Sequence, residues 1–194
     1  MKTTIKLSFL IISIFAAVAF TGCKQRAKNV IVMVISSPYR NEELILPETL
    51  LKKSGYKVLI ASKYRVNKGM LGGVRIRDID IAKAVKTDKK ALIFVGGTGV
   101  EKYWDDRDVQ QLAASAVNKG ILTGAICLAP GILAKAGLLQ GKKSTISAGA
   151  LDVLEESGGY YKGPGVFFDG NIITASGPKY AKEFALKILE QISK

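Results

Sequence analysis

The sequence contains no histidine, which excludes several kinds of catalytic site. A serine or cysteine nucleophile cannot be activated by an imidazole of the same chain, and a metal site cannot be built on histidine ligands. A glycine-rich phosphate loop that ends in Lys-Ser or Lys-Thr is also missing. The sequence therefore predicts neither a metal nor a cofactor, and any catalysis must use other groups to move protons.

Cysteine is scarce. The chain has only two, Cys23 and Cys127, so it can form at most one disulfide bond. If Cys23 carries a lipid, as argued below, Cys127 has no partner in the chain. A lone thiol in an oxidising compartment is unusual, and it makes Cys127 a candidate functional residue.

Acidic residues are also few, with 16 against 29 basic ones and a net charge of +13. Such a surface is attracted to anionic lipid or to other acidic polymers. The lysines are scattered, and there is neither an arginine-rich arm nor a basic motif interleaved with aromatic residues. We therefore do not expect nucleic acid to be a partner.

The first residues, MKTTIKLSFLIISIFAAVAFTGC, have the pattern of a secretory signal. A basic start precedes an apolar run from Leu7 to Phe20, which is too short for a durable membrane span. The ending FTGC resembles a bacterial lipoprotein signal, in which the cysteine becomes the first mature residue and carries lipid. The sequence predicts a signal peptide over 1–22, a lipid on Cys23 and a tether over 23–28. The protein would then be anchored to the membrane, on the periplasmic or extracellular side of a bacterial-type envelope. A plain cleaved signal and an uncleaved anchor are the alternatives.

Strand and helix patterns alternate along the rest of the chain. Strands are predicted over 29–36, 56–62, 90–97, 121–127 and 142–147, and helices over 41–55, 104–120, 129–137 and 178–193. Residues 72–85 suggest an edge strand or hairpin, and 166–176 a hairpin around Asp169-Gly170. This alternation predicts one α/β domain over 29–194, with a mostly parallel sheet covered on both faces.

The stretch TGAICLAPGILAKAG, residues 123–137, raises the possibility of a nucleophile at Cys127. A buried strand that turns sharply into a helix presents the turn residue at the carboxyl edge of the sheet. The amino end of the following helix favours a thiolate and would lower the pKa of the thiol. An ordinary buried core cysteine is the alternative.

Glu43 is the second candidate. It lies near the start of the first predicted helix, and Pro47 removes the amide that would donate to its carbonyl group. This predicts an irregular or kinked backbone around Glu43, at the edge of the sheet where α/β proteins bind ligands. The alternative is a solvated glutamate in the first turn of a helix.

Four segments resemble the PfpI/ThiJ family when taken in order: ELILP, FVGG, GAICLAPGILAKAGLLQGKKST and DGNIITASGP with the helix that follows it. The resemblance runs from about residue 29 to residue 192. It implies a flavodoxin-like three-layer sandwich, related to class I glutamine amidotransferase domains. Family members often dimerise, which extends the expectation to a homodimer.

The resemblance also implies roles for individual residues. Cys127 would be the nucleophile or an oxidation-sensitive thiol, and Glu43 a protonated acid that hydrogen-bonds to it. The amides of Gly97 and Leu128 would form an oxyanion hole, and Ser176, Gly177 and Pro178 the loop before the last helix. A carboxyl group beside a thiolate in a partly dry pocket has its pKa raised and stays protonated.

Leu128 stands where the peptidase-like members carry histidine, which argues against a Cys-His peptidase. The resemblance instead implies a cofactor-free glyoxalase or deglycase that acts on small reactive aldehydes such as methylglyoxal. A redox-sensing or stress-protective protein and a binding module with a decayed site are the alternatives.

Overall fold

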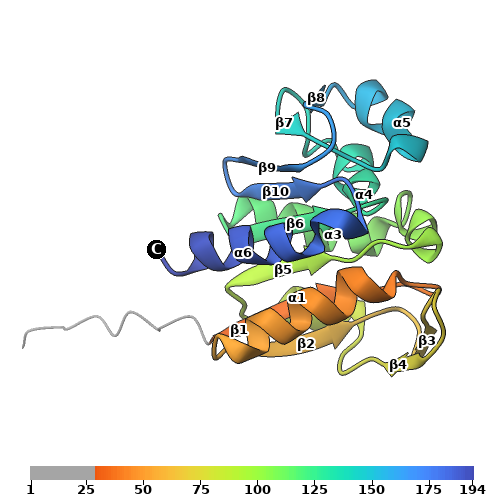
Figure 1. Ribbon diagram of the computed structural model, residues 1–194, viewed down its shortest axis with the longest axis vertical. Coiled ribbons are helices and arrows are strands. Elements are labelled where there is room, and N and C mark those ends of the chain that lie inside the picture. Colours follow the sequence, from red (N-terminus) through yellow and green to blue (C-terminus); the bar gives the residue numbers. More distant parts are fainter. Residues whose placement is uncertain (1–28) are drawn as a thin grey trace, which may run out of the picture.

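The structure is a computed structural model that describes residues 29–194, and its centre is a six-stranded sheet in the order β2-β1-β5-β6-β10-β9 (Figure 1). The strands are β1 Val30–Val34, β2 Lys57–Ala61, β5 Ala91–Phe94, β6 Leu122–Ile126, β9 Val166–Asp169 and β10 Ile172–Ala175. All neighbours pair in parallel except β9, which is antiparallel to β10. The predicted mostly parallel sheet is confirmed.

Helices cover both faces of the sheet, which gives the expected flavodoxin-like three layers. They are α1 Asn41–Lys53, α2 Ile81–Lys86, α3 Arg107–Asn118, α4 Pro130–Lys135, α5 Leu151–Glu156 and α6 Ala181–Ile192. Helices α1 and α6 pack together on one face, and α2, α3 and α4 follow one another on the other. Residues 29–194 thus contain the sheet and both helical layers, so we expect this part of the chain to fold without residues 1–28.

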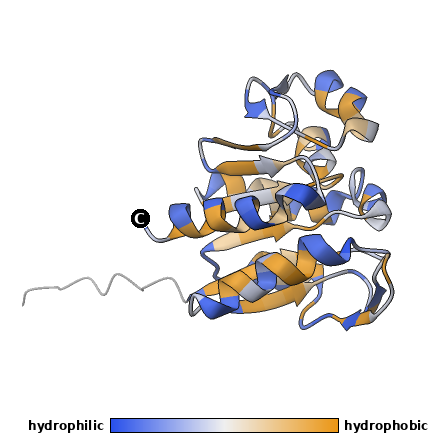
Figure 2. Ribbon diagram, in the orientation of Figure 1, coloured by the Kyte–Doolittle hydropathy of each residue, from blue (hydrophilic) through white to orange (hydrophobic). Residues whose placement is uncertain are grey.

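Each face of the sheet has its own apolar core. In β1, Val30, Val32 and Val34 face α2–α4, whereas the alternate residues Ile31 and Met33 face α1 and α6. The central strands are accordingly mostly apolar, with Thr123 and Thr174 as buried exceptions, while the helices carry polar residues on their outer surfaces (Figure 2). Burial on both faces explains why these strands appear in the sequence as continuous apolar runs.

Local sequence signals account for several element ends. Gly55, with φ of 85°, ends α1 through a hydrogen bond from its amide to Lys52. Asp106 caps α3 by accepting from the amides of Asp108 and Val109, so this helix begins later than the predicted 104. The hairpin around Asp169-Gly170 is confirmed as β9–β10.

Two predicted elements are corrected. Residues 72–85 form a strand only at β4 Val74–Ile76, which pairs with β3 Val66–Lys68, and then α2 follows behind its cap Asp80. The capping side chain selects a helix where the apolar spacing also suited a strand. Residues 142–147 contribute only β7 Lys143–Ser144, which pairs with β8 Tyr160–Tyr161 outside the central sheet. Three short 3₁₀ helices complete the elements of residues 29–194: η1 Thr98–Tyr103, η2 Ala148–Ala150 and η3 Pro178–Tyr180.

Pro47 does not interrupt α1, which continues as a helix from Asn41 to Lys53. The irregular backbone predicted around Glu43 is therefore not found. Only the hydrogen bond that the amide of residue 47 would have donated is lost, and the helix can tolerate this because α1 packs on the sheet and on α6.

The predicted signal peptide over 1–22, the predicted tether over 23–28 and Cys23 all lie outside the described residues. Among residues 29–194, no helix is both long and apolar enough to span a bilayer.

Candidate active site

The candidate site lies at the carboxyl edge of the sheet, where four neighbouring strands end. Glu43 follows β1, Gly96 and Gly97 follow β5, Cys127 follows β6 and Ser176 follows β10. In the sheet, β2 lies on one side of β1 and β5 on the other, so the chain connections from these strands run in opposite directions. The carboxyl ends of β1 and β5 therefore form a topological switch point, where α/β sheets commonly bind ligands.

Cys127 occupies a tight turn between β6 and α4. Its φ of 65° is the only positive value among the non-glycine residues that the structure describes. The amide of Cys127 donates to Ala175 at 2.8 Å, and its carbonyl oxygen accepts from the amide of Ser147 at the same distance. These bonds hold a backbone conformation that costs about 1–3 kcal/mol. Cys127 as a residue is only partly buried, so it is not sealed in the core.

Glu43 is fully buried in the first turn of α1, which rules out a solvated surface glutamate. Its Oε2 atom accepts a hydrogen bond from the amide of Gly96 at 3.1 Å. Its Oε1 atom has no well-formed hydrogen bond with any residue of the described chain. Since the Cys127 side chain interacts with this carboxyl group, the free oxygen is available to the thiol.

Gly96 allows the carboxyl and the thiol to approach each other. A Cβ atom on Gly96 would lie 2.6 Å from Cβ of Cys127, 2.8 Å from the carbonyl oxygen of Ile126 and closer still to Oε2 of Glu43. The side chains of Glu43 and Cys127 therefore both lie against the α-carbon of Gly96, where a larger residue would collide with each of them. Sequence reasoning did not single out Gly96, although the two glycines that end β5 were a usable signal.

A Gly96→Ala substitution should therefore destabilise the protein. Because Ile126 presents backbone at the crowded point, we expect a loss of about 1–3 kcal/mol in the free energy of unfolding, measured by urea denaturation. Gly149→Ala is the matched control, because a Cβ there meets nothing within 4 Å, and it should change stability by less than about 0.5 kcal/mol. Equal effects of the two substitutions would show that Gly96 is not a close-contact position.

The pKa of Cys127 is raised, contrary to the prediction from the helix end. Burial is the main cause, and the negative charge of Glu43 and its interaction with the thiol add to it, so that the pKa reaches about 12. The amides of Gly97 and Leu128 donate to the sulfur and lower the pKa, but their effect is smaller. Helix α4 begins only at Pro130 and has six residues, so its dipole is too short and too distant to dominate.

The pKa of Glu43 is raised to about 7, in the predicted direction and chiefly by burial. The interaction with the Cys127 side chain and the hydrogen bond from the Gly96 amide oppose this rise. The two groups titrate as a pair, and the carboxyl loses its proton before the thiol does. Near neutral pH, then, the pair is a neutral thiol beside a carboxyl group that is partly ionised.

This buried carboxyl should make the stability of the fold depend on pH. The pKa of Glu43 is higher in the folded chain than its ordinary value of 4.5, so its contribution is complete below pH 4.5 and is lost as the pH rises through about 7. The loss amounts to about 3 kcal/mol. Urea denaturation at a series of pH values should show this decline in the wild type and a flatter profile for Glu43→Gln. If the two profiles have the same slope, Glu43 has an ordinary pKa.

The loop of Ser176, Gly177 and Pro178 lies at the same edge, next to the site. Ala175, which precedes it, accepts the Cys127 amide. The Ser176 hydroxyl, however, accepts from the amide of Gly165 at 2.9 Å, which ties the loop to the chain before β9. The structure thus brings together Cys127, Glu43, Gly97 and Leu128, and places the Ser176 loop beside them.

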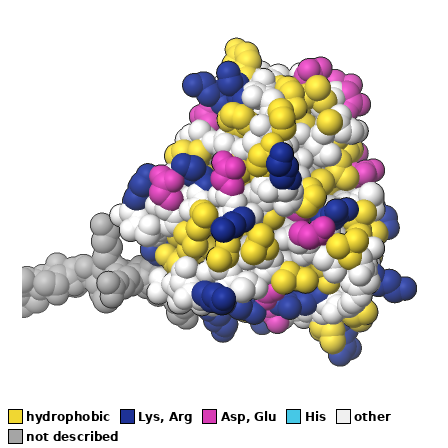
Figure 3. Space-filling view, in the orientation of Figure 1, with side chains coloured by type: hydrophobic (Ala, Val, Ile, Leu, Met, Phe, Trp, Pro, Cys, Tyr) yellow, Lys and Arg dark blue, Asp and Glu magenta, His cyan; other side chains and the backbone are white. Residues whose placement is uncertain are grey.

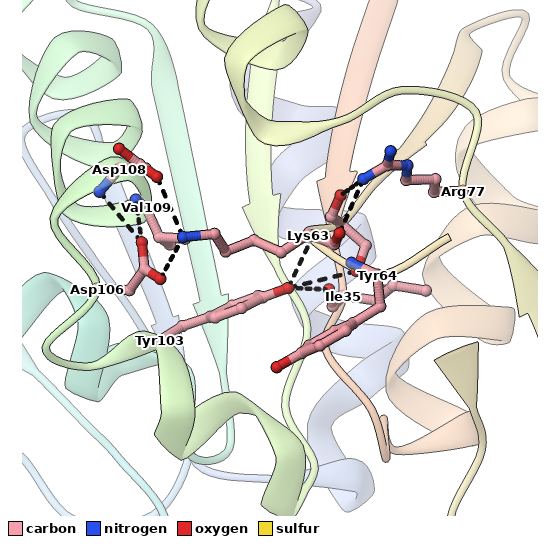
Figure 4. Close-up of polar contacts among 9 residues, drawn as sticks. Ile35, Lys63, Tyr64, Arg77, Tyr103, Asp106, Asp108 and Val109 are labelled. Atoms are coloured by element: carbon pink, nitrogen blue, oxygen red, sulfur yellow. Dashed lines mark hydrogen bonds and ion pairs between the residues drawn. The ribbon is translucent and has the colours of Figure 1, made fainter. Parts of the chain in front are cut away.

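A polar network holds η1, the segment that follows Gly97. The Tyr103 hydroxyl donates to the carbonyl of Ile35 at 3.3 Å and accepts from the amide of Lys63 at 3.1 Å (Figure 4). The Lys63 ammonium reaches Asp106 at 2.6 Å and Asp108 at 3.1 Å, at the start of α3. These contacts join the ends of β1 and β2 to η1, and so fix the backbone whose amide faces the sulfur.

Trp104 contacts the backbone of the site, and no group of metal-ligating side chains lies near it among residues 29–194. The indole of Trp104 donates to the carbonyl of Leu128 at 2.9 Å, which orients the residue after the candidate nucleophile. Among residues 29–194, no three histidine, cysteine or carboxylate side chains are grouped as metal ligands. The chemistry available at this edge is therefore that of a thiol, a carboxyl group and two backbone amides.

Comparison with known proteins shows the family of this chain. The sequence matches the DJ-1/PfpI family over residues 28–191. An uncharacterized protein of Methanocaldococcus jannaschii is 36% identical over 177 residues, which cover 88% of this chain and 86% of the relative. A glutathione-independent glyoxalase of Caenorhabditis elegans is 29% identical, with 85% and 89% covered, and a deglycase of Pyrococcus horikoshii 28%, with 76% and 90% covered.

A solved structure shows the same fold. The ThiJ/PfpI domain protein from Brachyspira murdochii superimposes with a TM-score of 0.82 at 27% identity, covering 86% of this chain and 97% of that one. The family match spans most of the chain, and the structural match includes the sheet that carries the candidate site. The chain therefore belongs to the DJ-1/PfpI family.

Proposed function

We propose that this protein is a cysteine-dependent enzyme that converts small reactive carbonyl compounds, as a glyoxalase or deglycase does, with Cys127 and Glu43 as its reacting pair. The main support for this proposal is that the Glu43 carboxyl group and the Cys127 side chain lie side by side against Gly96. Relatives named as a glyoxalase and a deglycase support the substrate class. The reaction steps are given for methylglyoxal, a small aldehyde with an adjacent ketone group.

The first step is addition of the thiol to the aldehyde. The Cys127 sulfur forms a bond to the aldehyde carbon, the carbonyl π bond breaks, and the thiol proton passes to the Glu43 carboxylate. Protonated Glu43 then returns this proton to the new alkoxide, which gives a hemithioacetal. A carboxyl with a pKa of about 7 suits both transfers, because it exchanges protons readily near neutral pH.

The second step moves a proton between the two substrate carbons. Glu43 removes the proton from the former aldehyde carbon, which gives an enediol, and returns it to the ketone carbon. The hydroxyl proton passes at the same time from the former aldehyde oxygen to the former ketone oxygen, so that the hemithioacetal becomes a thioester of lactate. Water then cleaves the thioester, so that methylglyoxal and one water give lactate and the free thiol. No electron is exchanged with an outside reagent. The amides of Gly97 and Leu128, which donate to the sulfur, stabilise the charge that develops there.

The high pKa of Cys127 argues against a peroxide sensor. Oxidation by peroxide uses the thiolate, and burial together with the charge of Glu43 keeps the thiol protonated near neutral pH. Deprotonation that is coupled to attack on a carbonyl does not need a standing thiolate.

The proposal is tested with a chain of residues 24–194, mixed with methylglyoxal while lactate is measured. We expect many molecules of lactate per molecule of protein. The same protein inactivated by heat is the control, because its lysines still react with aldehydes but its site is lost. Lactate no higher than in this control would overturn the proposal.

We also propose that the protein is a lipoprotein anchored through Cys23 on the outer side of a bacterial-type membrane. The support is the sequence before this residue, with its basic start, apolar run and FTGC ending. Cells that express the full chain would be grown with labelled palmitate. Label on the wild type and none on Cys23→Ala is expected, and an unlabelled wild type would contradict the lipid anchor.

A further inference from the structure

The amino edge of the sheet, opposite Cys127, holds a polar cavity that the proposed reaction does not use. It lies between the segment joining α2 to β5 and the end of α3, and its volume is about 220 Å³. Three lysines line it, Lys86, Lys89 and Lys119, together with Thr87 and Ser115. Asp88 is the one acidic residue in its wall, so the cavity carries a net positive charge.

Lys89 is the unusual member of this group, because the residue is only 5% exposed. Its Nζ atom donates to the carbonyl of Thr87 at 2.7 Å. An ammonium group has three N–H donors, and within residues 29–194 the other two have no hydrogen-bond partner. None of the three lysines forms an ion pair with a carboxylate of the described chain.

The positive charges in the cavity are crowded. Burial lowers the pKa of Lys89, and the neighbouring charge of Lys119 lowers it further, while Asp88 opposes this only in part. Lysines near helix ends often offset the negative C-terminal dipole, which would account for Lys86 in α2 and Lys119 at the end of α3. It does not account for Lys89, which lies in neither helix and loses hydration without gaining a carboxylate.

We propose that this cavity binds a phosphate group. Lys89 and Lys119 would donate charge-assisted hydrogen bonds to the phosphate oxygens, and the Ser115 hydroxyl, which has no intramolecular bond in the described chain, would donate a third. An anion held here relieves the repulsion between the two lysines and supplies the partner that the buried ammonium lacks. The ligand is either a small phosphorylated molecule or the phosphate of a lipid headgroup.

The position of the cavity favours a lipid headgroup as the source of the phosphate, because the proposed lipid anchor at Cys23 precedes residue 29 by only a few residues. Residue 29 enters the fold at this edge, where the amide of Lys57 donates to the carbonyl of Asn29 and the amide of Lys90 to that of Val30. The cavity lies at the start of β5, the neighbour of β1. On the face shown in Figure 3, basic side chains are spread over the upper, middle and lower parts, so exposed charge alone does not mark a site. The cavity differs because one of its charges is buried.

The test is titration of residues 24–194 with inorganic phosphate, followed by amide NMR shifts at physiological salt. We expect saturable shifts at Thr87, Lys89, Ser115 and Lys119. Lys119→Gln should weaken binding about tenfold. Lys162→Gln is the matched control: Lys162 is exposed, forms no ion pair among the described residues and lies outside the cavity, yet its substitution changes the net charge equally.

A second arm distinguishes the two sources of phosphate. Vesicles of phosphatidylglycerol and phosphatidylcholine would be sedimented with the wild type and both variants. Binding to the anionic vesicles that is reduced more by Lys119→Gln than by Lys162→Gln identifies a headgroup. If both substitutions reduce vesicle binding equally, while the wild type still shows saturable NMR shifts with phosphate, the ligand is a small phosphorylated molecule. Phosphate shifts that are absent, that do not saturate, or that respond equally to both substitutions would overturn the proposal.

Discussion

Replacing Cys127 by serine is expected to reduce lactate formation from methylglyoxal on the order of 10³-fold or more, the scale on which loss of a nucleophile acts. The serine hydroxyl has nearly the same shape as the thiol, but it is a far weaker nucleophile at neutral pH. Glu43 is too weak a base to activate a hydroxyl, and the chain has no imidazole to assist. The measurement is kcat/KM for lactate formation by purified protein.

The same variant should keep the fold. The amide of residue 127 still donates to Ala175, and serine accepts a positive φ no less readily than cysteine. A thermal melt close to that of the wild type is the control for intact structure. Turnover that survives in a folded Cys127→Ser protein would assign the chemistry to the lysines or to another site.

Glu43→Gln is expected to lower the rate at pH 7 by about 10²–10⁴-fold, the range typical of a lost general acid or base. Glutamine can still accept the hydrogen bond from the Gly96 amide, but it cannot take the proton of the thiol. In the wild type, kcat/KM should rise with pH through about 7 as Glu43 ionises, and in the variant this rise should be absent.

Glu42→Gln is the matched control for this substitution. Glu42 is the adjacent acid on the same helix, but its side chain is partly exposed and paired with Arg40. Its charge is the smallest of the influences on the pKa of Glu43, so its removal should leave the rate nearly unchanged. Equal losses in both variants would indicate a general effect of charge rather than proton transfer by Glu43.

The sequence was sufficient for most of the fold because its signals are local. Apolar runs such as 29–36 mark strands buried on both faces, and Asp169-Gly170 marks a hairpin, without knowledge of their neighbours. Residues 72–85 were misassigned in part, since their spacing fits both a strand and a short helix and the cap at Asp80 decides between them. The very short β7 and β8 depend on each other and have no strong local signal.

The candidate site was partly predictable, for a different reason. The carboxyl ends of parallel strands meet at one edge, so Glu43 and Cys127 could be expected to lie close together before any coordinates were available. The direction of the thiol pKa could not be predicted, because it is a balance between burial, a neighbouring carboxylate and two amides. The roles of Gly96 and Tyr103 depend on contacts between segments far apart in the chain.

The protonation of Glu43 is the quantity that tests the central claim most directly. Carboxyl carbons would be labelled with ¹³C-glutamate, and the Glu43 signal, assigned by its loss in Glu43→Gln, followed from pH 4 to pH 9 by NMR. We predict a midpoint near pH 7 in the wild type, displaced when Cys127 is replaced by serine. A midpoint near the ordinary 4.5, unaffected by that substitution, would show that the carboxyl and the thiol do not form a pair.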